Sequence, residues 1–115
     1  MDEPMASEQF AYMWRYEIDP HFRSEFLAAY NPGGEWVRLF SRDPAYLGTA
    51  LFQDFDDEDV YVTIDYWRSK GDRDAFRERF AVEFDSLDSK CEEFTKDEQF
   101  FGDYANLLGR ARRGE

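Results

Sequence analysis

One stretch of sequence, residues 60–68 (VYVTIDYWR), limits more than any other how this chain can fold. Its β-branched and aromatic side chains are typical of a β-strand. Side chains alternate between the two faces of a strand. Here one face carries Val60, Val62, Ile64, Tyr66 and Arg68, and the other carries Tyr61, Thr63, Asp65 and Trp67. Both faces are largely apolar, so the sheet that contains this strand needs cover on both sides, because monomeric proteins rarely expose a large apolar patch.

A second strand is predicted over residues 10–18 (FAYMWRYEI), where the side chains alternate for nine residues. One face of this strand carries Phe10, Tyr12, Trp14, Tyr16 and Ile18. The opposite face still holds Ala11 and Met13. Two further strands are expected over residues 46–55 and over residues 100–104.

Two helical regions complete the predicted elements. Asp19 and Pro20 fit the N-cap and first position of a helix, and a short second helix is expected over residues 36–40. Ser69 and Asp72 fit a capping box. The helix that it opens has its apolar residues at helical spacing: Phe76, Phe80, Phe84, Leu87, Cys91 and Phe94. The order of elements predicts an α+β fold, a ferredoxin-like βαββαβ domain with two layers, helices over a four-stranded antiparallel sheet.

The length of 115 residues suits one domain with a modest core. We expect a flexible leader over residues 1–9, a single domain over residues 10–106 and a flexible basic tail over residues 107–115. Phe, Tyr and Trp together number 22, against 13 Leu, Ile and Val. The predicted core is therefore built mainly from aromatic rings.

The formal net charge of −12 disfavours some partners. Nucleic acids and anionic membrane surfaces are bound chiefly by Lys and Arg, so neither is expected as a partner. The sequence holds no apolar run of the roughly 18–20 residues that a membrane-spanning helix needs. The acidic start of the chain does not resemble a signal peptide, so a cytoplasmic location is expected.

The scarcity of histidine and cysteine narrows the possible chemistry. With Cys91 as the one cysteine and His21 as the one histidine, neither an internal disulfide nor a conventional zinc site is expected. The glycines at positions 33, 34 and 48 do not match a nucleotide-binding fingerprint. The acidic turn at residues 54–59 has Asp59 where an EF-hand loop needs glycine. We therefore expect the protein to use no cofactor and no metal.

The two apolar faces of the sheet also predict an assembly. A single layer of helices covers one face only, and the simplest cover for the other is the same face of a second copy. We therefore expect a homodimer.

At this point the sequence resembles the antibiotic biosynthesis monooxygenase (ABM) superfamily. The resemblance spans about residues 10–103 and is carried by Asp19-Pro20, residues 45–49 (AYLGT), residues 63–69 (TIDYWRS) and Ala75-Phe76-x-x-Arg79-Phe80. It implies a dimeric α/β barrel with a pocket between helices and sheet in each subunit. The family includes cofactor-free oxygenases that act on phenolic polyketides and quinols, and it includes haem-degrading enzymes.

The resemblance also assigns candidate residues. Trp67 matches the family tryptophan that lines the pocket. Haem-degrading members pair it with an asparagine on the first strand and a histidine on the second helix, where this chain has Trp14 and Arg79. Haem breakdown is therefore not expected.

Together, the alternation and the resemblance predict an aromatic pocket that contains one carboxylate. Asp65 and Trp67 are the candidate catalytic residues, with Asp65 as a general base whose pKa is raised by desolvation. The candidate substrate-binding residues are Tyr12, Trp14, Tyr16, Tyr61, Thr63, Phe76, Arg79 and Phe80. The predicted activity is a cofactor-independent monooxygenase reaction on a small aromatic or quinol-like molecule.

Simpler interpretations remain open at this stage. The aromatic residues and Trp67 fit a plain core, and Asp65 fits an ion pair with Arg15 or Arg79. Arg79 also fits a solvated position and Cys91 a buried thiol. The function is then that of a non-catalytic dimer that binds small molecules, or of a structural or interaction module, since a fold does not fix a function.

Overall fold

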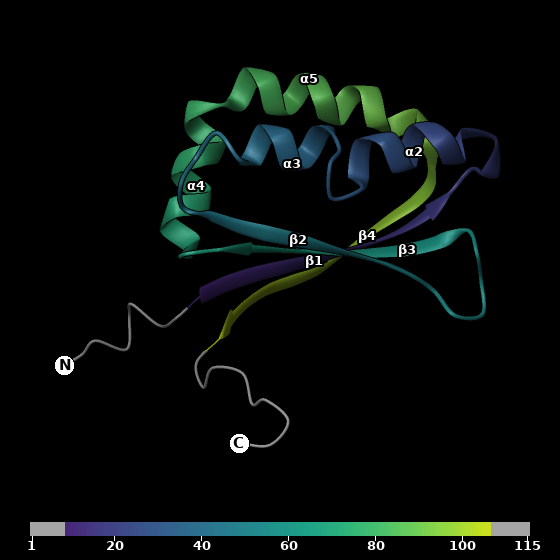
Figure 1. Cartoon of the computed structure of the whole chain (residues 1–115), viewed down its shortest axis with the longest axis horizontal. Helices are drawn as coiled ribbons and strands as arrows, with labels where there is room; N and C mark the ends of the chain where they lie inside the picture. Colours follow the sequence, from purple (N-terminus) through teal and green to yellow (C-terminus); the bar gives the residue numbers. More distant parts are fainter. Residues whose placement is uncertain (1–8, 107–115) are drawn as a thin grey trace.

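Four antiparallel strands form a sheet in the order β2-β3-β1-β4, and all the helices lie over one face of it (Figure 1). The strands are β1 (Gln9–Ile18), β2 (Tyr46–Gln53), β3 (Val60–Trp67) and β4 (Thr95–Asn106). The helical elements are η1 (Pro20–Phe22), α2 (Arg23–Tyr30), α3 (Glu35–Phe40), α4 (Lys70–Arg79), α5 (Ala81–Cys91) and η2 (Glu92–Phe94). This computed structural model confirms the predicted α+β, ferredoxin-like arrangement.

The structure describes residues 9–106. The expected leader and tail lie outside the described residues, except that Gln9 is the first residue of β1. Within the described part of the chain, no helix is both long enough and apolar enough to cross a membrane.

The alternation predicted for β1 is confirmed, and it fixes the register of the central strands. Phe10, Tyr12, Tyr16 and Ile18 are buried under the helices. In the antiparallel pair of β1 and β3, Tyr12 lies opposite Asp65 and Trp14 lies opposite Thr63. Directly opposite residues share a face of a sheet, so these side chains all point toward the helices.

The first helical region begins at Asp19, as the sequence predicted. The Asp19 carboxylate accepts a hydrogen bond of 3.0 Å from the backbone N–H of His21, and Pro20 occupies the first turn. The chain then turns into α3 at Gly34. A Cβ atom at this position would lie 2.6 Å from the carbonyl oxygens of Ala28 and Ala29, so only glycine fits this close approach.

The second helical region differs from the single helix that the spacing predicted. The chain breaks at Phe80, whose φ of −110° and ψ of 30° are not helical, and the direction changes sharply between α4 and α5 (Figure 1). The apolar period continues through the break because both helices turn the same stripe toward the core. Phe76 of α4 packs against Trp67 at the end of the sheet, and Phe84 of α5 packs against Trp36. Because α4 and α5 run in different directions, one helix packs against Trp67 and the other against Trp36.

The last strand is longer than predicted: β4 spans 12 residues rather than residues 100–104. As an edge strand it pairs only with β1, and most of its side chains are exposed. Such a strand needs no alternation of apolar and polar side chains, so the sequence pattern did not reveal its first half. The register shifts between Met13 and Trp14 of β1, close to Gly102, whose φ is +128°.

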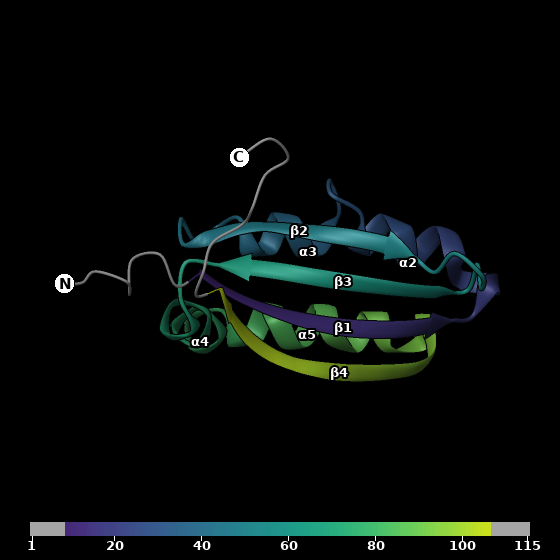
Figure 2. The ribbon, with the colours of Figure 1, turned by 90° about the horizontal axis from the view of Figure 1, so that it is seen from below.

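The face of the sheet away from the helices is apolar and uncovered in this single chain. Figure 2 shows the strands in front of the helices on this side. By register, Phe52, Tyr66 and Tyr104 lie on this face, and they are 55%, 37% and 45% exposed. Met13, Val62 and Ile64 lie between them and are partly buried. We call these six residues the outer face.

Candidate functional site

A cavity of about 270 Å³ lies between the helices and the covered face of the sheet. Half of the residues in its wall are aromatic. The strands contribute Tyr12, Trp14, Tyr16, Thr49, Thr63, Asp65 and Glu98, and the helices contribute Tyr30, Trp36, Val37, Phe40, Arg77, Phe84 and Asp88. Five of the predicted site residues therefore surround one cavity: Tyr12, Trp14, Tyr16, Thr63 and Asp65.

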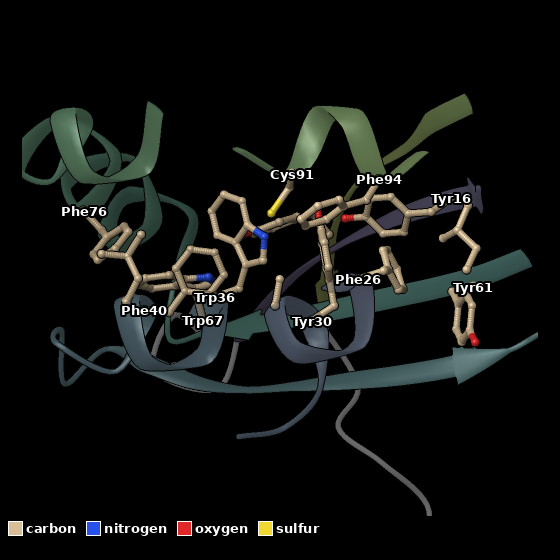
Figure 3. Close-up of a cluster of buried hydrophobic side chains, with 14 of the residues drawn as sticks. Tyr16, Phe26, Tyr30, Trp36, Phe40, Tyr61, Trp67, Phe76, Cys91 and Phe94 are labelled. Carbon is tan, nitrogen blue, oxygen red and sulfur yellow. The ribbon is translucent and has the colours of Figure 1, made fainter. Parts of the chain in front are cut away.

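Trp67 faces the helices, as the alternation predicted, but it lies in the aromatic core and outside the cavity wall. Its side chain is 0% exposed. Figure 3 shows Trp67 beside Phe40 and Phe76, and its ring centroid lies 5.6 Å and 5.1 Å from theirs. The centroid of the Tyr46 ring lies 5.4 Å away. Trp67 thus supports Phe40, which does line the cavity.

Phe76 and Phe80 also lie outside the cavity wall. Phe76 is fully buried beside Trp67. Phe80 stacks against Phe76 with ring centroids 4.8 Å apart, and the guanidinium of Arg79 lies 5.0 Å from the centroid of the Phe80 ring. These two phenylalanines are part of the core around the second half of α4 and its junction with α5.

Tyr61 and Arg79 are held by partners away from the cavity. The Tyr61 hydroxyl accepts hydrogen bonds of 2.8 Å from Arg23 and 3.2 Å from Gln53. Tyr61 lies at the opposite end of the buried cluster from Trp67 (Figure 3). Arg79 donates a hydrogen bond of 2.9 Å to the carboxylate of Asp43, and its side chain is 58% exposed.

Asp65 is 7% exposed and has no ion-pair partner among residues 9–106. The suggested pairing with Arg79 is wrong because Arg79 binds Asp43, and Arg15 lies on the other face of β1. Oδ1 of Asp65 accepts a hydrogen bond of 2.5 Å from Thr49. Burial raises the pKa of Asp65 to about 6, although the Thr49 hydrogen bond and the charge of Arg73 act in the opposite direction.

Thr49 belongs to a short chain of hydroxyl groups that ends at Asp65. An ionised carboxylate only accepts hydrogen bonds, so Thr49 donates to Asp65, and its oxygen is left to accept from the Tyr46 hydroxyl. Burial raises the pKa of Tyr46 to about 12, so Tyr46 keeps its proton near neutral pH. Sequence analysis missed both residues. The register would have found Thr49, which lies directly opposite Asp65 in the β2–β3 pair.

Arg73 is a third residue that sequence analysis missed. It is buried on α4, and its guanidinium carbon lies 4.8 Å from the centroid of the Tyr12 ring and 4.9 Å from that of Phe10. Burial, and after it the negative charge of Asp65, raise the pKa of Tyr12 far above its ordinary value. The Tyr12 phenol is therefore a neutral wall of the cavity.

The cavity also has charged residues that no sequence pattern indicated. Asp88 of α5, Glu98 of β4 and Arg77 of α4 all contribute to its wall. Their elements are remote from one another in the sequence, and only the folded chain brings them together. Within residues 9–106, no group of three or more His, Cys, Asp or Glu side chains is arranged to hold a metal ion.

Comparison with protein-family models and with curated proteins finds no match for this sequence. Solved structures do match. SnoaB, a cofactor-independent oxygenase from Streptomyces nogalater, aligns over 94% of this chain and 99% of its own, with 19% identity and a TM-score of 0.65.

Two further solved structures are named as candidate antibiotic biosynthesis monooxygenases. The one from Bacteroides thetaiotaomicron has 13% identity and a TM-score of 0.71, and covers 93% of this chain and 97% of its own. The one from Bordetella bronchiseptica has 16% identity and a TM-score of 0.70, and covers 88% of this chain and 99% of its own. The expected resemblance is confirmed at the level of structure: this chain has the fold of the antibiotic biosynthesis monooxygenases.

Proposed function

We propose that this protein is a cofactor-independent monooxygenase whose substrate is a small aromatic or quinol-like molecule bound in the cavity. The proposal rests on one observation: the carboxylate of Asp65 is buried in the cavity wall and has one oxygen without a hydrogen-bond partner among residues 9–106. This carboxylate is buried in an aromatic wall, and Thr49 holds only one of its two oxygens. No hydrogen bond from residues 9–106 reaches Oδ2, which is thus available to a substrate.

The cavity supports this proposal by its size and lining. A cavity of roughly 150 Å³ holds one benzene molecule, so a volume of about 270 Å³ suits one or two fused rings. Flat walls from Trp14, Trp36 and Phe84 match a flat, apolar guest.

The proposed reaction begins with proton transfer to Asp65, a base in an apolar cavity. Oδ2 of Asp65 takes a proton from a phenolic O–H or from an activated ring CH₂ group, and the substrate becomes an electron-rich anion. In the CH₂ case, dioxygen adds to the carbanion and the adduct takes up a proton to give a hydroperoxide. Loss of water then gives a carbonyl group. One oxygen atom enters the product and the other leaves in water, and the substrate itself supplies the electrons.

A pKa of about 6 suits Asp65 for this task. The carboxylate is ionised near neutral pH, yet it is a stronger base than an exposed aspartate. The hydroxyl of Thr49 fixes its orientation, and Tyr46 holds Thr49 in turn.

The decisive experiment measures oxygen uptake with a panel of anthrones and quinols, after a thermal-shift screen has selected those that bind. Asp65→Asn should still bind them and should lose turnover by at least about 100-fold, the usual contribution of a general base. Asp85→Asn, on the exposed side of α5, is the matched control and should keep wild-type rates. Wild-type turnover in Asp65→Asn would remove Asp65 from the mechanism.

A non-catalytic binding protein is the second candidate, and the same cavity favours it. Such a protein would bind the panel without consuming oxygen. A purely structural module is not favoured, because a filled core would leave no cavity of this size around a buried carboxylate.

We also propose that the protein is a homodimer that associates through the outer face. This face belongs to the same strands that form the floor of the cavity, and its exposed aromatic side chains give it the apolar character of an interface.

A further inference from the structure

The wall of the cavity carries more negative than positive charge. Three carboxylates contribute to it, those of Asp65, Asp88 and Glu98, against the single guanidinium of Arg77. Asp65 is buried, whereas Asp88 and Glu98 lie in exposed positions on α5 and β4. The carboxylates of Asp88 and Glu98 therefore mark the open end of the cavity, which we call the acidic rim.

Each carboxylate of the acidic rim has a second carboxylate nearby that raises its pKa: Glu92 acts on Asp88, and Asp88 acts on Glu98. Partial burial of the carboxyl group, and after it the neighbouring Glu92, raise the pKa of Asp88; Arg77 lowers this pKa and Asp85 adds to the rise. Burial raises the pKa of Glu98 as well, and Asp88 is the first of the charged groups that add to this effect, ahead of Glu92 and Asp97. Burial is the larger cause of both shifts, and the neighbouring carboxylates add to it. A cation placed at the acidic rim offsets the part that comes from these carboxylates.

The aromatic walls attract cations too. The face of a tryptophan, tyrosine or phenylalanine ring is negative and attracts a positive group within about 6 Å of its centroid. Arg77 shows this geometry inside the site, with its guanidinium carbon 4.2 Å from the centroid of Phe84. The rings of Trp14, Tyr16 and Trp36 complete the wall.

We propose that the molecule bound in this cavity is a small aromatic amine in its protonated form, with its ring between the aromatic walls and its ammonium group at the acidic rim between Asp88 and Glu98. This inference deepens the proposed function, on which it rests, by naming the charge of the substrate. It leaves Asp65 free at the inner end of the cavity to act on the ring. The net charge of −12 draws cations toward the protein at long range.

The test compares three ligands that share one ring system and differ in charge. These are 1-naphthylmethylamine, 1-naphthalenemethanol and 1-naphthoic acid, each titrated into the full-length protein by calorimetry at neutral pH. The amine is expected to bind at least about 10-fold more tightly than the alcohol, and the acid more weakly than both. Added salt should weaken binding of the amine and leave that of the alcohol unchanged.

Variants of the charged wall residues test which side chains cause the preference for the amine. In the double variant Asp88→Asn and Glu98→Gln, the amine should lose its advantage of about 10-fold over the alcohol, while the alcohol keeps its affinity. Arg77→Gln removes the one positive group of the wall and should raise the affinity for the amine. Glu25→Gln removes an exposed carboxylate of α2 that lies outside the cavity wall and is not among the charges acting on Asp88 or Glu98, so it is the control and should leave all three affinities unchanged.

Several results would overturn the inference: equal affinities for amine and alcohol, tightest binding of the acid, or no binding of any of the three. Oxygen uptake separates it from the proposed function. Selective binding of the amine, together with no oxygen uptake from any anthrone or quinol of the panel, would support the inference and reject the monooxygenase. Turnover of the neutral anthrones and quinols, together with equal affinities for the amine and the alcohol, would do the reverse.

Discussion

The hydroxyl of Thr49 donates a hydrogen bond of 2.5 Å to Oδ1 of Asp65 across the β2–β3 pair, and this contact gives the buried carboxylate a fixed orientation. It also stabilises the ionised form of Asp65, against the effect of burial. The first predictions test this relationship.

Replacing Thr49 with valine should raise the pKa of Asp65 above about 6, because the hydrogen bond that favours the charged form is lost. Since the proposed base works only when ionised, the rate of oxygen uptake should rise with pH through this pKa. We expect the acid limb of the profile of kcat/KM against pH to move upward by about one pH unit. Thr49→Ser keeps the donor and should restore the wild-type profile. An unchanged profile in Thr49→Val would mean that the contact does not tune Asp65.

The raised pKa of Asp65 also predicts a dependence of stability on pH. The folded-state pKa of about 6 lies above the ordinary value of 3.8, so the folded protein holds this proton over a pH range in which the unfolded chain has lost it. The contribution of Asp65 to the free energy of unfolding therefore falls as pH rises from about 4 to about 6. Asp65→Asn should stabilise the protein by about 2 kcal/mol at pH 7 and have little effect at pH 4. Thermal unfolding at both pH values measures this, with Asp85→Asn as control. Equal effects at the two pH values would contradict it.

A charge on the outer face should dissociate the proposed homodimer. Tyr66→Lys places an ammonium group among Phe52, Tyr104 and the other apolar side chains of this face. Light scattering coupled to gel filtration should then report a dimer for the wild type and a monomer for the variant. Val82→Lys is the matched control, since Val82 is 80% exposed on α5, on the helical side of the molecule. A wild-type monomer would refute the proposed assembly.

Gly34 should be the glycine least tolerant of a side chain. An added Cβ would lie 2.6 Å from two backbone carbonyl oxygens between α2 and α3, so the chain must shift to admit it. We expect Gly34→Ala to lower the free energy of unfolding by about 2 kcal/mol or more. At the adjacent Gly33 the nearest atom lies 3.9 Å away, so Gly33→Ala should change stability far less. Denaturant unfolding of the two variants makes the comparison.

The sequence predicted the sheet and five of the residues that line the cavity, and it did so for one reason. The alternation in residues 10–18 and 60–68 states which side chains share a face, and the register then places Tyr12 opposite Asp65 and Trp14 opposite Thr63. A helical stripe of apolar residues shows which side chains are buried but not where one helix ends and the next begins, so the helices were predicted less precisely than the strands. The stripe of phenylalanines identified a helical region and could not show the break at Phe80, since both helices bury the same stripe.

The remaining site residues could not be predicted from local pattern. Trp67 shares a face with Asp65, yet it lies at the end of the strand, where Phe40, Tyr46 and Phe76 enclose it. Asp88 and Glu98 look like ordinary solvated charges in the sequence. Their place at the cavity depends on how α5 and the edge strand β4 lie against each other, which is a property of the whole fold.

Asp65 and Tyr66 are consecutive residues of β3 that point to opposite sides of the sheet. A displacement of the strand that improves the fit between two copies must also move the carboxylate, because one peptide unit joins the two residues. Selection for the proposed assembly and selection for the proposed chemistry would therefore act on the same eight residues of this strand. A change in β3 that favours one of these two properties would constrain the other.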